Sequence, residues 1–316
     1  MINFRYHVVS IVAVFLALAV GIVMGTTVIS ESVVGRLQAD AREFRARNGE
    51  LRQEADRLEQ ELSYYDRFGE AIVPPAISGR LAGRSAVLVI EDAAPGTLID
   101  RTTDALRAAG ASTPARIRLT AAWSLPDAGA RENLAAALGG DADASDGPAL
   151  MTRAGEALGR RLTSSADAGA EADLLRALDR GGFVKLEDLP EVSFPAANAL
   201  IVYLAGGTPT PVPDHQTFAI PLLRMLAGER TNARVAVAEP LDADASLVDG
   251  VRGVAELARA IATIDHATTW PGALALVWAL AATAREPAAH YGVRRGASAI
   301  APSIIPAGSP GAEQAP

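Results

Sequence analysis

The hydrophobic pattern of the chain begins with one unbroken apolar stretch close to the N-terminus. Residues 8–29 contain no charged side chain, and at about 1.5 Å per helical residue they match a hydrocarbon core of about 30 Å. A cleaved signal peptide usually has an apolar region of only about 7–15 residues, followed by a cleavage site. A charged, amphipathic stretch follows here instead. We therefore expect a transmembrane anchor that is not removed.

The charges that flank this anchor predict how it crosses the membrane. Arg5 precedes the apolar stretch, and Glu31 is the first charged residue after it. The positive-inside rule then places residues 1–7 in the cytoplasm and the rest outside, as a single-pass protein of the cell membrane. Four arginines that follow the anchor reduce the difference in positive charge between its two sides: Arg36, Arg42, Arg45 and Arg47.

Small residues form a stripe along one face of the anchor. They recur at every fourth position, as Ala13, Ala17, Gly21 and Gly25. Such a stripe lets two helix backbones approach closely in lipid and predicts a packing face for self-association. The alternative is a chance alignment, because alanine and glycine are common in membrane helices.

A pattern of period seven follows the anchor over residues 30–70. Its seam consists of Leu37, Phe44, Asn48, Leu51, Leu58, Leu62 and Tyr65. Apolar residues at a and d positions over about five heptads predict a coiled-coil stalk. Asn48 lies at a central a position, where a buried amide fixes the register of a parallel dimer.

The charges beside this seam do not favour pairing of two parallel copies. In such a dimer Asp40 and Arg45 attract, whereas three pairs repel: Arg47–Arg52, Glu54–Glu59 and Glu61–Asp66. Gly49 weakens the helix by about 1 kcal/mol relative to alanine. Three partners for the seam therefore remain open: a second copy, another protein, or the chain's own α/β domain.

Beyond the stalk, short apolar runs alternate with helical stretches. Pro74 and Pro75 predict the end of the stalk helix. The apolar runs predict strands at 86–90, 116–119, 183–186, 199–204 and 234–238. The helical stretches are 97–109, 131–138, 148–162, 171–180, 214–226 and 271–285. This alternation indicates an α/β fold with a mostly parallel sheet flanked by helices. We expect the α/β domain to span 80–290 and the Pro-rich residues 291–316 to form a flexible tail.

Composition removes several classes of function. The chain has no cysteine, which excludes disulfides, zinc–thiolate sites and thiol nucleophiles. Its net charge is −8, and no basic stripe suited to nucleic acid is present.

The loops after the predicted strands carry few signs of chemistry. They contain Glu91-Asp92, Gly206-Gly207 and Glu239-Pro240, without a phosphate loop or a nucleophile elbow. We expect Glu91 and Asp92 to be solvated loop carboxylates and the protein not to be an enzyme. His215, His266 and His290 are weak candidates for a metal site, because they lack ligand spacing. No cofactor is expected in the chain itself.

Several short motifs suggest a family. Arg5-x-His7 precedes Val9-Ser10 and AVFLALAVGIVMG, and Pro271-Gly272 and Tyr291-Gly292 occur near the end. With the order of anchor, stalk and α/β domain, the chain resembles the actinobacterial copper transporter family. The resemblance implies a cell-envelope protein of copper efflux and homeostasis, with copper as the transported ion. It also allows an outer-membrane location, whereas the helical anchor favours the cell membrane.

A second functional hypothesis follows from the anchor and the stalk alone. A membrane-tethered scaffold or interaction module would use the seam and the α/β domain to bind other envelope proteins, without transport activity. A homo-oligomer formed through anchor and stalk is compatible with either hypothesis.

Overall fold

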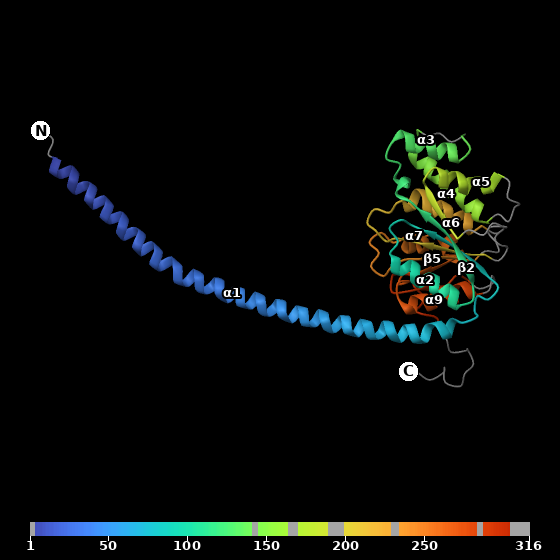
Figure 1. The fold of residues 1–316 in the computed structure, drawn as a ribbon, viewed down its shortest axis with the longest axis horizontal. Coiled ribbons are helices and arrows are strands. Elements are labelled where there is room, and N and C mark those ends of the chain that lie inside the picture. The colour runs from blue at the N-terminus through green and yellow to red at the C-terminus, as the bar shows by residue number, and fades with distance from the viewer. Residues whose placement is uncertain are drawn as a thin grey trace. The chain divides into compact units, whose positions relative to one another are not determined.

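A computed structural model describes residues 4–140, 145–163, 170–188, 199–228, 234–282 and 287–303. The chain divides into two units, Met1–Tyr65 and Asp66–Pro316. We call the second unit the body; its sheet and helices are shown in Figure 1.

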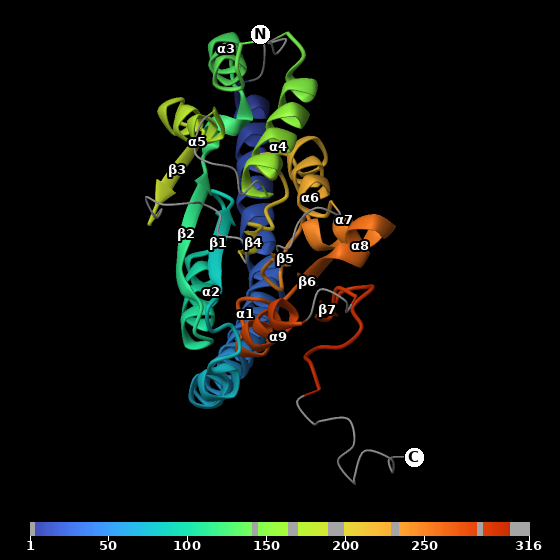
Figure 2. The same ribbon diagram turned by 90° about the vertical axis from the view of Figure 1, so that its right-hand side faces the viewer.

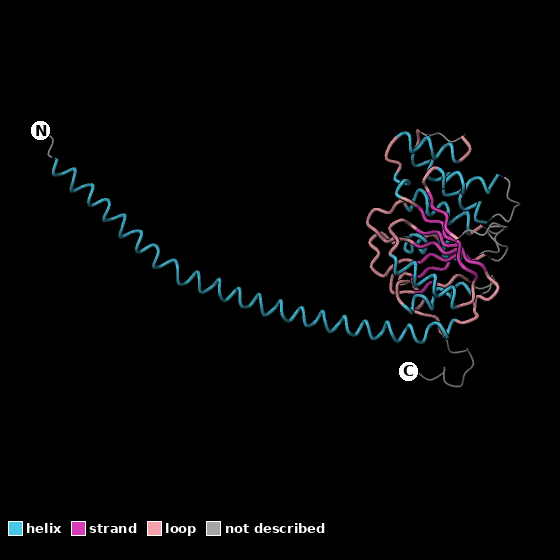
Figure 3. The backbone as a smooth tube through the Cα atoms, viewed as in Figure 1, coloured by secondary structure: helices cyan, strands magenta, loops and turns pink. Residues whose placement is uncertain are grey.

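One helix, α1, runs from Phe4 to Ile77 and carries the predicted anchor and stalk. Figure 3 shows it as a single helical trace. Its segment Phe4–Gly25 is long and apolar enough to cross a membrane, with a mean hydropathy of 2.8 and no buried side chain.

Pro74 and Pro75 do not end this helix, contrary to the sequence prediction. Both lie inside α1, which ends at Ile77. A proline inside a helix costs about 3 kcal/mol or more. Val73 and Ile77 offset this cost, because both are buried in the core of the body and each such burial contributes about 1.5–3 kcal/mol. The final turns of α1 therefore belong to the body rather than to the stalk.

Gly69 shows how closely this end of α1 packs. A Cβ atom there would overlap the side chain of Trp270, whereas a Cβ at Gly49 would meet nothing within 4 Å. We expect Gly69→Ala to destabilise the body by about 1–3 kcal/mol through overpacking. Gly49→Ala, the control in the same helix, should instead stabilise the helix by about 1 kcal/mol. Urea unfolding of the full-length chain in detergent measures both, and a Gly69→Ala variant as stable as the wild type would contradict the packing.

The body is built on a seven-stranded sheet of order β3-β2-β1-β4-β5-β6-β7. Its strands are β1 (Ser85–Ile90), β2 (Ser112–Leu119), β3 (Val184–Glu187), β4 (Leu200–Leu204), β5 (Arg234–Ala238), β6 (Ile261–Ile264) and β7 (His290–Tyr291). Only β3 at one edge is antiparallel, and the other pairings are parallel. The prediction of a mostly parallel sheet flanked by helices is confirmed.

Helices cover both faces of this sheet (Figure 2). One face carries η1 (Ala121–Ser124), α3 (Ala128–Ala137), α4 (Gly147–Thr163), α5 (Ala170–Arg180), η2 (His215–Ala219), α6 (Ile220–Leu226), α7 (Leu247–Gly253) and α8 (Ala255–Ala260). The other carries α2 (Gly96–Ala108), α9 (Trp270–Ala281) and the end of α1. Side chains of β1 alternate between the two cores, with Val87 and Val89 in the first and Leu88 and Ile90 in the second.

Several elements differ from the prediction. The helix expected at 214–226 begins as a π-helix, η2, and the helix expected to reach residue 285 ends at Ala281. Sequence patterning missed four short elements, α7, α8, β6 and β7, because two to seven residues are too few to show a period.

The first residues of the predicted tail, 291–316, lie beside the sheet. Residues 290–299 pair with β6 and with each other, through β7 and a bridge between Tyr291 and Ala299. Residues 304–316 lie outside the described part of the chain.

Candidate functional site

The strand order directs attention to the carboxyl ends of β1 and β4. The chain leaves β1 toward β2 on one side and later returns to β4 on the other. In open α/β sheets, such a switch point is where ligands usually bind. A ligand site is therefore expected first in the loops that follow β1 and β4.

Glu91, directly after β1, is fully buried at this point, with 0% exposure. Its Oε1 atom accepts a hydrogen bond from the Tyr203 hydroxyl at 2.9 Å and lies 2.9 Å from His215 Nε2. Its Oε2 atom accepts from Gly206 N at 2.7 Å. Burial, together with the nearby Glu91 carboxylate, holds the pKa of Tyr203 well above its usual value. Glu91 is thus a buried structural carboxylate, and the expectation of a solvated one holds only for its exposed neighbour Asp92.

The crevice at the switch point is filled by the protein's own loops. A Cβ atom on Gly206 would lie 2.8 Å from backbone and side-chain atoms of Ala93. Gly207 has a φ of +71°, and a Cβ there would lie 2.6 Å from the side chain of Ala243. Loops that touch so closely leave no space for a methyl group at these contacts.

Two further buried carboxylates lie at the same edge of the sheet. Glu239, after β5, is fully buried and accepts hydrogen bonds from Ser246 Oγ at 2.6 Å and Val248 N at 3.2 Å. Burial raises its pKa, and these hydrogen bonds partly oppose that rise. Asp265, after β6, is also fully buried and pairs with Arg252 Nη1 at 2.8 Å.

Asp265 also fastens a segment that we call the C-terminal strap, residues 290–299. Its carboxylate accepts hydrogen bonds from Val293 N at 2.8 Å and Arg294 N at 3.0 Å. Gly292, with a φ of +143°, packs directly on this carboxylate, where any Cβ would overlap it. Arg252 donates to the Tyr291 carbonyl at 3.1 Å as well. The acidic residues at the carboxyl ends of β1, β5 and β6 therefore bind the loops that cover this edge of the sheet.

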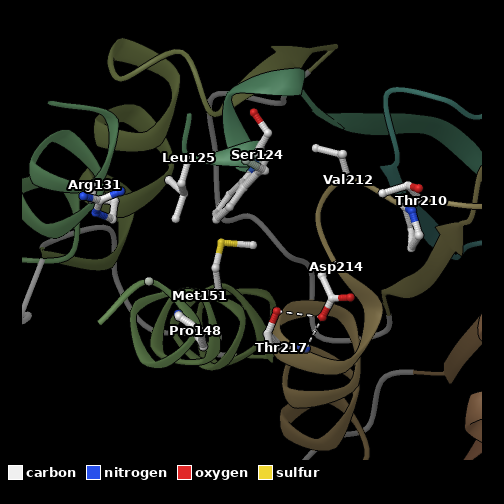
Figure 4. Close-up of a pocket in the computed structure, with 12 residues that line it drawn as sticks. Ser124, Leu125, Arg131, Pro148, Met151, Thr210, Val212, Asp214 and Thr217 are labelled. Atoms are coloured by element: carbon white, nitrogen blue, oxygen red, sulfur yellow. Dashed lines mark hydrogen bonds between the residues drawn. The ribbon is translucent and has the colours of Figure 1, made fainter. Parts of the chain in front are cut away.

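A cavity of about 420 Å³ lies beside this edge (Figure 4). It is bounded by η1 and the residues after it, the start of α3, the start of α4, and the loop between β4 and η2. Its lining is Trp123, Ser124, Leu125, Arg131, Gly147, Pro148, Met151, Thr210, Pro211, Val212, Asp214 and Thr217. Its size falls in the range of small-molecule sites, about 300–1,000 Å³.

Comparison with known proteins places the chain in a family. The family described as "Copper transport outer membrane protein, MctB" matches residues 1–302. The proteins named "Copper transporter MctB" in Mycobacterium bovis and Mycobacterium tuberculosis are 26% identical over 315 residues. These alignments cover 95% of this chain and 99% of each relative. The chain belongs to the MctB family.

The three candidate metal ligands of this MctB-family chain contact different groups. His215 lies against Glu91, and His266 Nδ1 lies 3.7 Å from Asp265 Oδ1. His290 contacts Thr263 Oγ1 and the Ala258 carbonyl. Within the described ranges, no group of three or more His, Cys, Asp or Glu residues is arranged to hold a metal ion. The proposed metal role of these histidines stays a prediction.

The other predicted sites of this MctB-family member lie on α1. The apolar side chains of the seam are exposed, from 46% for Leu58 to 70% for Phe44 and Leu51, whereas Asn48 is half-buried. The stripe residues Gly21 and Gly25 have open space around them. The partner of either face stays a prediction.

The two histidines with lowered pKa values predict how stability depends on pH. Burial lowers the pKa of His266 and His290 below the ordinary 6.5. The folded state then binds fewer protons than the unfolded state. The free energy of unfolding is therefore highest above about pH 6.5, and it decreases as the pH falls through the lower pKa of the folded state. Glu239, whose pKa is raised, acts with the opposite sign.

Comparison of the wild type with His290→Gln isolates one of these contributions. Glutamine can still bond Thr263 and the Ala258 carbonyl but does not titrate. We expect the variant to lose less stability than the wild type between about pH 7.5 and 5.5, as measured by urea unfolding of the full-length chain. Equal losses would show that His290 titrates in the folded state as it does in the unfolded state.

Proposed function

We propose that this chain is a membrane-anchored protein of the cell envelope that takes part in copper efflux and so in copper homeostasis. The observation that carries the proposal is the match to the MctB family over residues 1–302, together with the similarity to the mycobacterial copper transporters along 95% of the chain. Copper is the cargo in this proposal and not a resident cofactor, and the body catalyses no reaction.

The proposed topology places residues 1–7 in the cytoplasm and the body outside. The apolar segment Phe4–Gly25 supports a single crossing, and Arg5 on its N-terminal side supports this direction. Its sheet runs from β3 at one edge to β7 at the other, and we infer an accessory or oligomeric role for the body in transport.

Deletion and complementation test this function. A strain without the gene should tolerate less copper and accumulate more of it inside the cell. The full-length chain should restore both values, and a version without residues 1–29 should not. Unchanged tolerance and unchanged intracellular copper in the deletion strain would refute the proposal.

A second candidate function is a tethered scaffold, favoured by the exposed seam of α1. Leu37, Phe44, Leu51, Leu62 and Tyr65 are each at least 62% exposed. Large apolar side chains in a row of this kind mark an interaction face. Ion pairs within the helix, Arg47–Glu43 and Arg57–Glu54, both at 2.8 Å, reduce the repulsion expected between two parallel copies.

Cysteine crosslinking distinguishes the partners of this seam. Because the chain has no cysteine of its own, each variant carries a single thiol. Pairing of two parallel copies predicts disulfide-linked dimers in membranes for Leu51→Cys and Leu58→Cys. Gln53→Cys, on the outer side of the heptad, is the control that should remain monomeric. No dimer at Leu51 or Leu58 would exclude self-pairing and leave a different partner for the seam.

A further inference from the structure

The exposed seam of α1 is bordered by charges whose sign changes along the helix. In a coiled coil, the e and g positions border the apolar a and d positions and face the partner helix. Here the N-terminal part of the seam is bordered by arginines and the C-terminal part by glutamates: Arg45, Arg47, Arg52, Glu54, Glu59 and Glu61. Asp40, further toward the anchor, is acidic. All of these residues are exposed, so they can meet the charges of a partner helix.

This change of sign disfavours a second parallel copy as the partner. In register, like parts of the two helices meet, so arginine faces arginine and glutamate faces an acidic residue at most flanking pairs. The ion pairs within α1, Arg47–Glu43 and Arg57–Glu54, have side chains that are 53–73% exposed. Exposed pairs of this kind are weak, so they lessen the repulsion between two copies without cancelling it.

The side-chain volumes along the seam lead to the same conclusion. The a positions of the central heptads are small or polar and the d positions are large: Ala41, Asn48 and Ala55 against Phe44, Leu51 and Leu58. In a parallel pair of identical helices, each a residue meets its own copy, and so does each d residue. Two copies would therefore leave space between paired alanines and crowd two phenylalanine rings into one layer. Cavities and overpacking both destabilise a packed interface.

We propose that the seam of α1 binds an amphipathic helix of a different protein, with flanking charges opposite to its own. The partner helix carries acidic residues where it faces the three arginines and basic residues where it faces the three glutamates. Large aliphatic side chains of the partner fill the layers of Ala41 and Ala55. The like charges on α1 act against self-pairing and so make the partner specific. This inference rests on the scaffold function proposed above and states the chemistry of its partner.

Three synthetic peptides test this partner on the full-length chain in detergent, with fluorescence anisotropy as the measurement. The complementary peptide has leucine at its a positions, alanine opposite Phe44, and flanking charges opposite to those of α1. The reversed peptide has the same composition with its flanking lysines and glutamates exchanged. The third peptide reproduces residues 34–65 of the chain itself. We expect the complementary peptide to bind at least about tenfold more tightly than either of the others, because the facing charge pairs change from repulsion to attraction.

Variants of the chain test whether charge excludes a second copy. Each variant carries Leu51→Cys as the crosslinking site, since the chain has no cysteine of its own. With the natural flanking charges, we expect no disulfide-linked dimer in membranes. The combined exchanges Arg52→Glu, Glu54→Arg and Glu61→Arg turn the repelling pairs of the parallel dimer into attracting ones, so dimers should then form. The same exchanges should weaken binding of the complementary peptide by about tenfold or more.

Three results would overturn the proposal, and they differ in what they leave standing. A dimer of the Leu51→Cys chain with its natural flanking charges would make a second copy the partner and leave the scaffold function in place. Equal binding of the complementary and reversed peptides, or a charge-exchanged chain that stays monomeric, would show that charge does not select the partner. If no peptide binds a chain that is helical by circular dichroism, the seam is not a docking face and the scaffold function fails with it.

Discussion

Replacing Glu91 with alanine should lower the free energy of unfolding by about 3–5 kcal/mol. The substitution leaves the Tyr203 hydroxyl and the Gly206 amide without their acceptor in a fully buried position and removes the contact with His215 Nε2. Each unsatisfied buried group costs about 1–3 kcal/mol. Since small domains are stable by only about 5–15 kcal/mol, this single change removes a large share of the total.

Urea unfolding followed by tryptophan fluorescence of the full-length chain in detergent measures this loss. Asp92→Ala is the matched control, because the neighbouring carboxylate is exposed and surface changes usually stay within about 0.5 kcal/mol. A Glu91→Ala protein within about 1 kcal/mol of the wild type would show that water replaces the carboxylate.

Replacing Arg252 with alanine should have an effect of similar size at the other end of the sheet. Arg252 and Asp265 form an ion pair at 2.8 Å, with side chains 6% and 0% exposed. Removing one partner of a buried pair costs about 3–5 kcal/mol, because the other charge stays buried without compensation. The C-terminal strap would also lose the Arg252 hydrogen bond to the Tyr291 carbonyl.

A surface pair of nearly the same geometry supplies the comparison for this variant. Arg224 and Glu256 lie 3.0 Å apart, but their side chains are 55% and 64% exposed. Arg224→Ala should therefore cost no more than about 1 kcal/mol. The same unfolding measurement applies to both variants. Equal costs would mean that burial does not decide the strength of the Arg252 pair.

The sequence predicted the elements whose pattern is local. The apolar run of β1 and the helical period of α2 are visible within windows of 6 and 13 residues. The end of α1 was misplaced at Pro74 and Pro75, because local propensity says nothing of the burial of Ile77 in a core made by distant segments. Tertiary packing outweighed the prolines.

The sites were harder to predict than the fold, because their residues are far apart in the chain. Glu91 meets Tyr203, Gly206 and His215 across 112 to 124 positions, so neither its burial nor its partners follow from its neighbours. An acidic residue directly after three of the buried strands was the one available signal. The cavity carries no sequence motif, since four separate segments line it.

The burial of Val73 and Ile77 sets where a soluble version of this protein can begin. A truncation at residue 80, which the sequence pattern recommends, would remove two core side chains and expose the apolar surface beneath them. It would also remove Asp66, whose carboxylate pairs with Arg101 at 2.9 Å. A version starting at or before residue 66 retains these contacts. Crystallisation and binding studies of the body should therefore keep the last turns of α1.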